Sequence, residues 1–136
     1  MTNKLQITLR LIVAMLLVSA IAACSPLSTK VNPIKIKRLI FINKSLTPLK
    51  NVRIFIVKTN EVVVCGYILS KTECSTGFSL REYKGNRFDV FWMDGVQQKS
   101  VTNVLVEIPK DLSLDKPVNA VIVFGEQGKF SARLQH

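Results

Sequence analysis

Histidine is nearly absent from this sequence: the only one is His136, at the end of the chain. A Ser-His-Asp triad needs an imidazole held rigidly between a nucleophile and an acid, and a terminal residue is usually frayed. Gly125 and Gly128 indicate a turn, and no glycine-rich phosphate loop is present. Carboxylates are few, and nothing places two of them together for acid–base chemistry: Glu73, Glu82, Asp89, Asp94 and Glu107. We therefore expect a protein that is not an enzyme and uses no cofactor.

Cysteine is also scarce, with three residues in the chain. Structural zinc needs about four ligands, which the two later thiols and one histidine do not supply, so no metal site is expected. Cys65 and Cys74 stand too far apart for a redox motif, in which the two thiols lie within two or three residues. Their spacing favours a structural disulfide that ties one strand to the loop or strand after it.

Long apolar runs are absent except near the N-terminus, where Leu11 to Ala23 carries no charge, Gly or Pro. As a helix, these thirteen residues would extend for about 20 Å, less than a bilayer requires. Lys4 and Arg10 precede the run as a positively charged region. The pattern is typical of a signal peptide and not of a permanent transmembrane helix.

The run ends in Ile21-Ala22-Ala23-Cys24, which resembles the lipobox of bacterial lipoproteins. The resemblance implies a diacylglyceryl group on the thiol of Cys24, cleavage just before it, and acylation (palmitate is one such acyl group) of the new amine. The alternative is an ordinary signal peptidase that reads Ala20-Ile21-Ala22 as its site. Lipid on Cys24 explains the odd cysteine count, because it leaves an even set for an oxidising compartment.

Three segments follow from this interpretation: residues 1–23 as the signal peptide, 24–33 as a lipidated tether and 34–136 as one domain. Nine extended tether residues reach about 30 Å. Ser25 after the cysteine resembles the outer-membrane class, so we expect a lipid-anchored protein that faces the periplasm, with the inner membrane and the cell surface as alternatives. The whole sequence has nineteen Lys and Arg residues and nine Asp and Glu residues. Removal of the signal peptide takes away Lys4 and Arg10, so the mature chain has seventeen cations and a formal net charge of +8.

The remaining residues form short runs rich in Val, Ile and Phe, separated by turn residues. Their period-two alternation predicts an all-β domain with antiparallel sheets, and no helical periodicity lasts beyond one turn. We expect a β-sandwich of seven to nine strands with an immunoglobulin-like or transthyretin-like topology, and a small β-barrel is the alternative. Residues 43–57 resemble the opening strands of secreted immunoglobulin-like modules.

Several strands have a definite predicted face. Ile34, Ile36, Ile40 and Ile42 are expected on one side of the first strand, and Phe88, Val90 and Trp92 on one side of a later one. Asp94-Gly95 predicts a hairpin. A long strand, or two with a bulge, is expected over residues 96–108.

One basic surface is a candidate binding site. Arg81, Tyr83, Lys84 and Arg87 join two predicted strands across a turn, and Lys99 on the next strand is expected to extend the cluster. Guanidinium and aromatic groups together suit anionic polymers or sugars. The alternative is an ordinary charged strand edge that discourages aggregation. A second cluster, Lys35, Lys37 and Arg38, begins just after the tether and would lie near anionic headgroups.

These features favour a non-catalytic, membrane-anchored binding or assembly module of the bacterial cell envelope, with an envelope protein as its partner. The alternative is direct binding of an anionic envelope polymer, peptidoglycan or lipopolysaccharide, through the basic hairpin. No specific binding of nucleic acid is expected.

Overall fold

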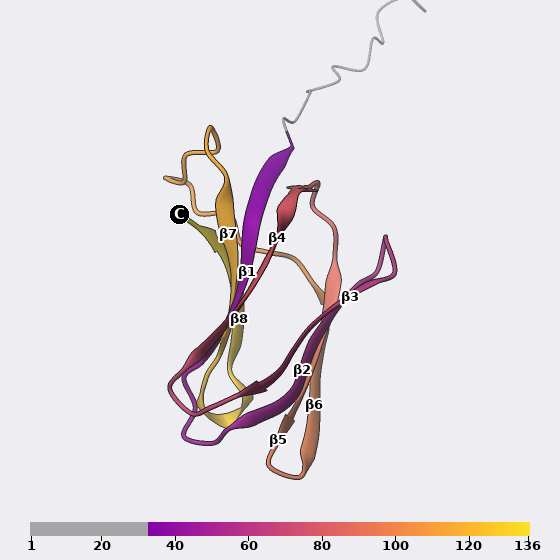
Figure 1. The fold of residues 1–136 in the computed structure, drawn as a ribbon, viewed down its shortest axis with the longest axis vertical. Helices are drawn as coiled ribbons and strands as arrows, with labels where there is room; N and C mark the ends of the chain where they lie inside the picture. The colour runs from indigo at the N-terminus through magenta and orange to yellow at the C-terminus, as the bar shows by residue number, and fades with distance from the viewer. Residues whose placement is uncertain (1–32) are drawn as a thin grey trace, which may run out of the picture. The chain divides into compact units, whose positions relative to one another are not determined.

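The computed structural model describes residues 33–136, which form eight β-strands and one short 3₁₀ turn, Glu126–Gly128 (Figure 1). The strands are β1 (Ile34–Asn43), β2 (Leu49–Ile56), β3 (Glu61–Ile68), β4 (Glu73–Tyr83), β5 (Phe88–Asp94), β6 (Gln97–Val104), β7 (Val118–Phe124) and β8 (Phe130–Gln135). The predicted strand count and the all-β class are confirmed.

The strands form two four-stranded sheets that share no strand. Sheet A has the order β4-β1-β7-β8 and sheet B the order β3-β2-β5-β6. All neighbours are antiparallel except β1 and β7, which are parallel. The predicted β-sandwich is therefore confirmed, and the small-barrel alternative is wrong because the described strands do not close on themselves. The first strand of an immunoglobulin sheet pairs with the second, whereas β1 pairs with β4 and β7, so the strand order differs from that of an immunoglobulin domain.

The core lies between the sheets and follows the alternation of the strands. Phe88, Val90 and Trp92 all point inward from β5, as predicted, and Trp92 is only 3% exposed. The indole ring meets Phe124 edge-on, with ring centroids 5.0 Å apart, and stacks on Phe130 at 6.3 Å. Aromatic pairs of this geometry add about 0.5–1.5 kcal/mol to the stabilisation from burial. Trp92 is thus a core residue.

The predicted face of β1 is wrong beyond its third residue. Ile34 and Ile36 are buried as expected, but Leu39 and Phe41 are the buried residues further along the strand. The pairing register of β1 shifts between Ile36 and Arg38 against both of its neighbours. A β-bulge adds one residue to a strand and reverses which side chains point inward. Ile40 therefore lies on the outer face of sheet A, half-buried.

The prediction of a strand over residues 96–108 is also wrong in its last part. β6 ends at Val104, and the chain then leaves sheet B for sheet A, where Glu107 forms a parallel bridge with Arg133. The predicted hairpin before β6 is confirmed: Asp94 pairs with Gln97, and Gly95 has a φ of 62°, which a glycine adopts without strain.

A buried asparagine holds together the end of the sandwich where β1 leads into β2. The side chain of Asn43 is fully buried, and its amide nitrogen donates to the carbonyl oxygens of Thr47, Ile68 and Leu69 at 2.8, 3.2 and 3.1 Å. Its amide oxygen accepts hydrogen bonds from the backbone nitrogen of Ser45 at 2.9 Å and from the hydroxyl of Ser45 at 2.7 Å. These bonds join the β1–β2 loop to the β3–β4 turn, and we call this the closed end.

Candidate functional site

Cys24, the signal peptide over residues 1–23 and the tether over 24–33 are predictions on a part of the chain that, up to residue 32, lies outside the described residues. Lipidation of Cys24 therefore stays a prediction. Within residues 33–136 no helix is long and apolar enough to cross a membrane.

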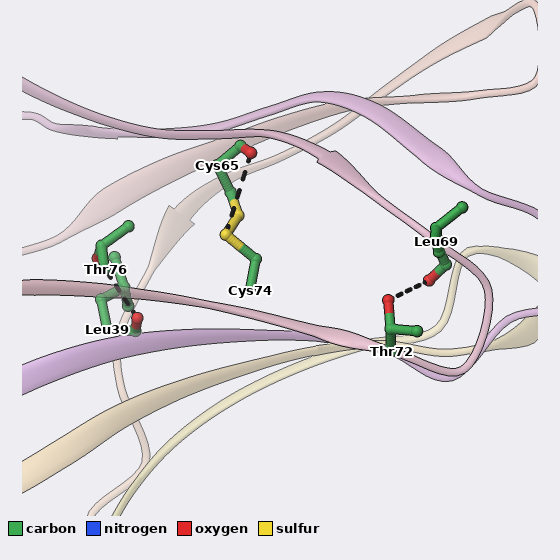
Figure 2. The surroundings of a disulfide bond; sticks show 6 residues. All are labelled: Leu39, Cys65, Leu69, Thr72, Cys74 and Thr76. Carbon is green, nitrogen blue, oxygen red and sulfur yellow. Dashed lines mark hydrogen bonds between the residues drawn. A yellow bond between two sulfur atoms is a disulfide. The ribbon is translucent and has the colours of Figure 1, made fainter.

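Cys65 and Cys74 form the predicted disulfide, with Cα atoms 6.3 Å apart. Figure 2 shows the two side chains meeting, to the left of the turn in which the hydroxyl of Thr72 donates to the carbonyl of Leu69. Because β3 belongs to sheet B and β4 to sheet A, the disulfide joins an edge of one sheet to an edge of the other. Closing so short a loop stabilises the fold by about 2–3 kcal/mol in the chain-entropy estimate.

The sequence suggested that the basic segment over residues 81–87 is a hairpin, but in the structure it is not. β4 lies in sheet A and β5 in sheet B, so the segment crosses from one sheet to the other. Each cation in it has a partner: Arg81 pairs with Glu61 of β3, the Lys84 ammonium lies 3.2 Å from the Glu82 carboxylate, and Arg87 donates to a backbone carbonyl at 3.0 Å. The positive charges of this segment are therefore partly neutralised by its neighbouring carboxylates and backbone carbonyl.

The two remaining residues of the predicted basic surface lie apart from these cations. Lys99 is opposite Trp92 in the β5–β6 pair, five residues along from Arg87, which is about 16 Å in a strand. Its ammonium is 3.8 Å from the Asp94 carboxylate. Tyr83 is half-buried against the core, and its hydroxyl accepts a hydrogen bond from the backbone nitrogen of Val106 at 3.3 Å. The structure thus does not bring Lys99 close to the other cations. The Tyr83 hydroxyl holds the backbone of the segment that follows β6.

The outer face of sheet B carries apolar side chains where a sandwich usually presents polar ones. On the edge strand β3, Val62 and Val64 are 54% and 56% exposed. The register places Phe55 of β2 beside Val62, with Phe91 of β5 on the same face. We call this surface the outer apolar patch; it consists of Phe55, Val62, Val64, Phe91 and Met93.

A cation lies within this patch. Arg53 pairs in register with Val64 on one side and Phe91 on the other, and its guanidinium lies 5.5 Å from the centroid of the Phe91 ring. A hollow of about 180 Å³ is lined by these three residues together with Asn51, Trp92, Met93 and Gln98. The patch thus combines exposed apolar area with positive charge.

The second concave feature is a cavity of about 410 Å³ between the two sheets. Its interior is aliphatic apart from one aromatic ring and is lined by buried side chains of both sheets, including Ile36, Leu39, Ile54, Phe88, Ile122 and Ala132. Ala120 and Ala132 point inward from the adjacent strands β7 and β8, where larger residues would fill the space. The cavity therefore follows from small residues at two inward positions of sheet A.

Polar groups gather at the mouth of this cavity, at the end opposite the closed end, where β1 begins and β2 turns into β3. They are Thr59, Glu61, Ser79, Arg81, Glu82, Tyr83 and Asn86. The hydrogen bond from Arg81 is the main cause that lowers the pKa of the Glu61 carboxyl below its usual value. An ion pair from opposite sheets thus lies at the opening of an apolar interior.

Sequence reasoning missed both the cavity and the outer apolar patch. The inward alanines resemble ordinary strand residues, and the patch arises because β3 is apolar on both faces. The one signal in the sequence was the continuous run Val62 to Cys65, which lacks the polar alternation of its neighbours. In residues 33–136 no group of three or more His, Cys, Asp or Glu side chains could hold a metal ion.

Comparison with protein-family models, with curated proteins and with solved structures finds no match to this chain.

Proposed function

We propose that this protein is a non-catalytic lipoprotein of the bacterial cell envelope, anchored through Cys24, whose sandwich binds a protein partner. The observation that carries the binding role is the outer apolar patch. Exposed apolar patches on soluble domains mark interaction sites, because covering them removes apolar surface from water. The lipobox sequence Ile21-Ala22-Ala23-Cys24 supports the anchor, and Ser25 supports the outer membrane as its location.

The edge position of the patch indicates how a partner would bind. β3 pairs only with β2, so one side of its backbone has no neighbouring strand within sheet B. A partner that contributes an extended strand gains main-chain hydrogen bonds there, and its apolar side chains would cover Val62 and Val64. Arg53 and Lys50, which is also on this outer face, would favour acidic residues in the partner.

Site-specific photocrosslinking in intact cells tests this proposal. A benzophenone side chain at Val64 is expected to give one crosslinked product of defined mass. The same group at Ser131, an exposed position on β8 of the other sheet, serves as the matched control and should give none. Val64→Asp should abolish co-purification of that product, and Ser131→Asp should not. Equal crosslinking from both positions would contradict a specific partner at the patch.

A second candidate is direct binding of an anionic envelope polymer, either peptidoglycan or lipopolysaccharide. It is favoured by the exposure of Arg81, Lys84 and Arg87 within one crossover segment. Reversing these charges to Glu should remove sedimentation with isolated sacculi or lipopolysaccharide. Unchanged sedimentation would contradict polymer binding and leave the protein partner as the remaining candidate.

A further inference from the structure

The cavity between the sheets has no role in the proposed membrane anchor or in partner binding at the outer apolar patch. Its volume of about 410 Å³ falls within the roughly 300–1,000 Å³ of small-molecule sites. Its interior offers aliphatic contacts, whereas its polar groups are confined to the mouth. A ligand that fits must be apolar along its length and polar at one end, as a single acyl chain with a headgroup is.

The charge around the mouth selects the sign of that headgroup. Ile34 pairs with Tyr83 and Ile36 with Arg81, so the start of β1 lies at the mouth. The charged residues that line the cavity are Arg81, Glu61 and Glu82. On the surrounding elements cations are in excess: Lys35, Lys37, Arg38, Lys58, Lys84 and Arg87 stand against Asp89. An anionic headgroup therefore gains from the local field.

We propose that this cavity binds the acyl chain of a single-chain anionic amphiphile, of the fatty-acid class, with its carboxylate at Arg81. The carboxylate competes with Glu61 for the guanidinium, because both are acceptors for the same donors. The aliphatic walls formed by Ile36, Ile54 and Ile122 contact the chain. Burial of each methylene removes apolar surface from water, which supplies most of the affinity.

Photolabelling of the full-length protein in phosphatidylcholine nanodiscs tests the proposal. The probe is hexadecanoic acid with a mid-chain diazirine, compared with hexadecanol that carries the same group. The acid is expected to label peptides with the inward residues Ile122 and Ala132. Arg81→Gln should reduce labelling by the acid on the order of tenfold, the effect of one charge-assisted hydrogen bond, and leave labelling by the alcohol unchanged.

Two further variants keep the test decisive if Arg81→Gln fails to fold. Glu61→Gln removes the competing carboxylate and should increase labelling by the acid. Ala132→Leu reduces the cavity and should suppress labelling by both probes, whereas Ser131→Leu, its exposed neighbour on β8, should not. Labelling that is equal in Ala132→Leu and the wild-type chain would overturn the proposal. So would inward labelling that appears only when Cys24→Ser removes the anchor, because the protein's own lipid would then be the occupant.

Discussion

Arg81 on β4 and Glu61 on β3 form an ion pair between the edge strands of two different sheets. The disulfide between Cys65 and Cys74 joins the same two strands nearer the closed end. Between these two links the inner faces of the sheets border the cavity. One link is covalent, and the other is an exposed electrostatic contact that a ligand or a change of pH can alter.

The pKa of Glu61 is expected to respond to its partner. In the wild-type protein, the hydrogen bond from Arg81 holds this pKa below its usual value, and Arg81→Gln should raise it. Because the folded-state pKa is depressed, the stabilisation is present above the ordinary carboxyl pKa and is lost as the pH falls through the folded value. Carbon-detected NMR titration of the Glu61 carboxyl measures the shift. An identical titration curve in Arg81→Gln would contradict the pairing.

The disulfide is expected to contribute about 2–3 kcal/mol to the free energy of unfolding. Cys65→Ser and Cys74→Ser should each lower the urea midpoint, and the double variant should lower it no further, because either change opens the same loop. Reduction of the wild-type protein should have an effect of similar size. A midpoint unchanged by all of these treatments would show that the bond does not constrain the fold.

Asn43 is expected to be among the most sensitive positions in the core. Asn43→Ala removes the side-chain donor to the carbonyl of Ile68 and the buried acceptor of the Ser45 hydroxyl, which costs about 1–3 kcal/mol. Ser100→Ala, at an exposed position on β6, serves as a control and should change stability by less than about 0.5 kcal/mol. Equal denaturation midpoints for the two variants would contradict the role given to the Asn43 network.

Filling the cavity is expected to stabilise the protein. Ala132→Leu adds apolar volume at an inward position that borders the cavity, so it should raise the free energy of unfolding by about 0.5–2 kcal/mol. In a domain of this size, that change corresponds to an increase in melting temperature of several degrees. Differential scanning calorimetry measures it. A lower melting temperature would mean that the position is already fully packed.

The sequence predicted those features that depend on local alternation and spacing. Phe88, Val90 and Trp92 alternate without interruption, and all three are buried. The spacing of Cys65 and Cys74 likewise predicted their pairing. The predicted inward face of β1 is wrong beyond Ile36 because a bulge adds one residue without any change in composition. A strict period of two then assigns the wrong side chains to the core.

Features that depend on which sheet a strand joins could not be predicted in this way. Lys84-Gly85-Asn86 has the composition of a hairpin turn, but turn propensity does not specify the sheet to which the next strand belongs. The chain crosses to sheet B there, and the predicted basic hairpin became a crossover. The cavity depends on Ala120 and Ala132 both pointing inward from the adjacent strands β7 and β8, which requires the fold and the pairing register and not only the sequence of either strand.

The anchor at Cys24 is the claim on which the proposed location and role depend. Mass spectrometry of the N-terminal peptide, from the full-length protein expressed in bacteria and recovered from membranes, tests it most directly. A lipid-anchored protein should give a peptide that begins at Cys24 and carries a diacylglyceryl thioether and an acylated amine, and Cys24→Ser should give no such peptide. A peptide that begins at Ala23, followed by an unmodified Cys24, would contradict it.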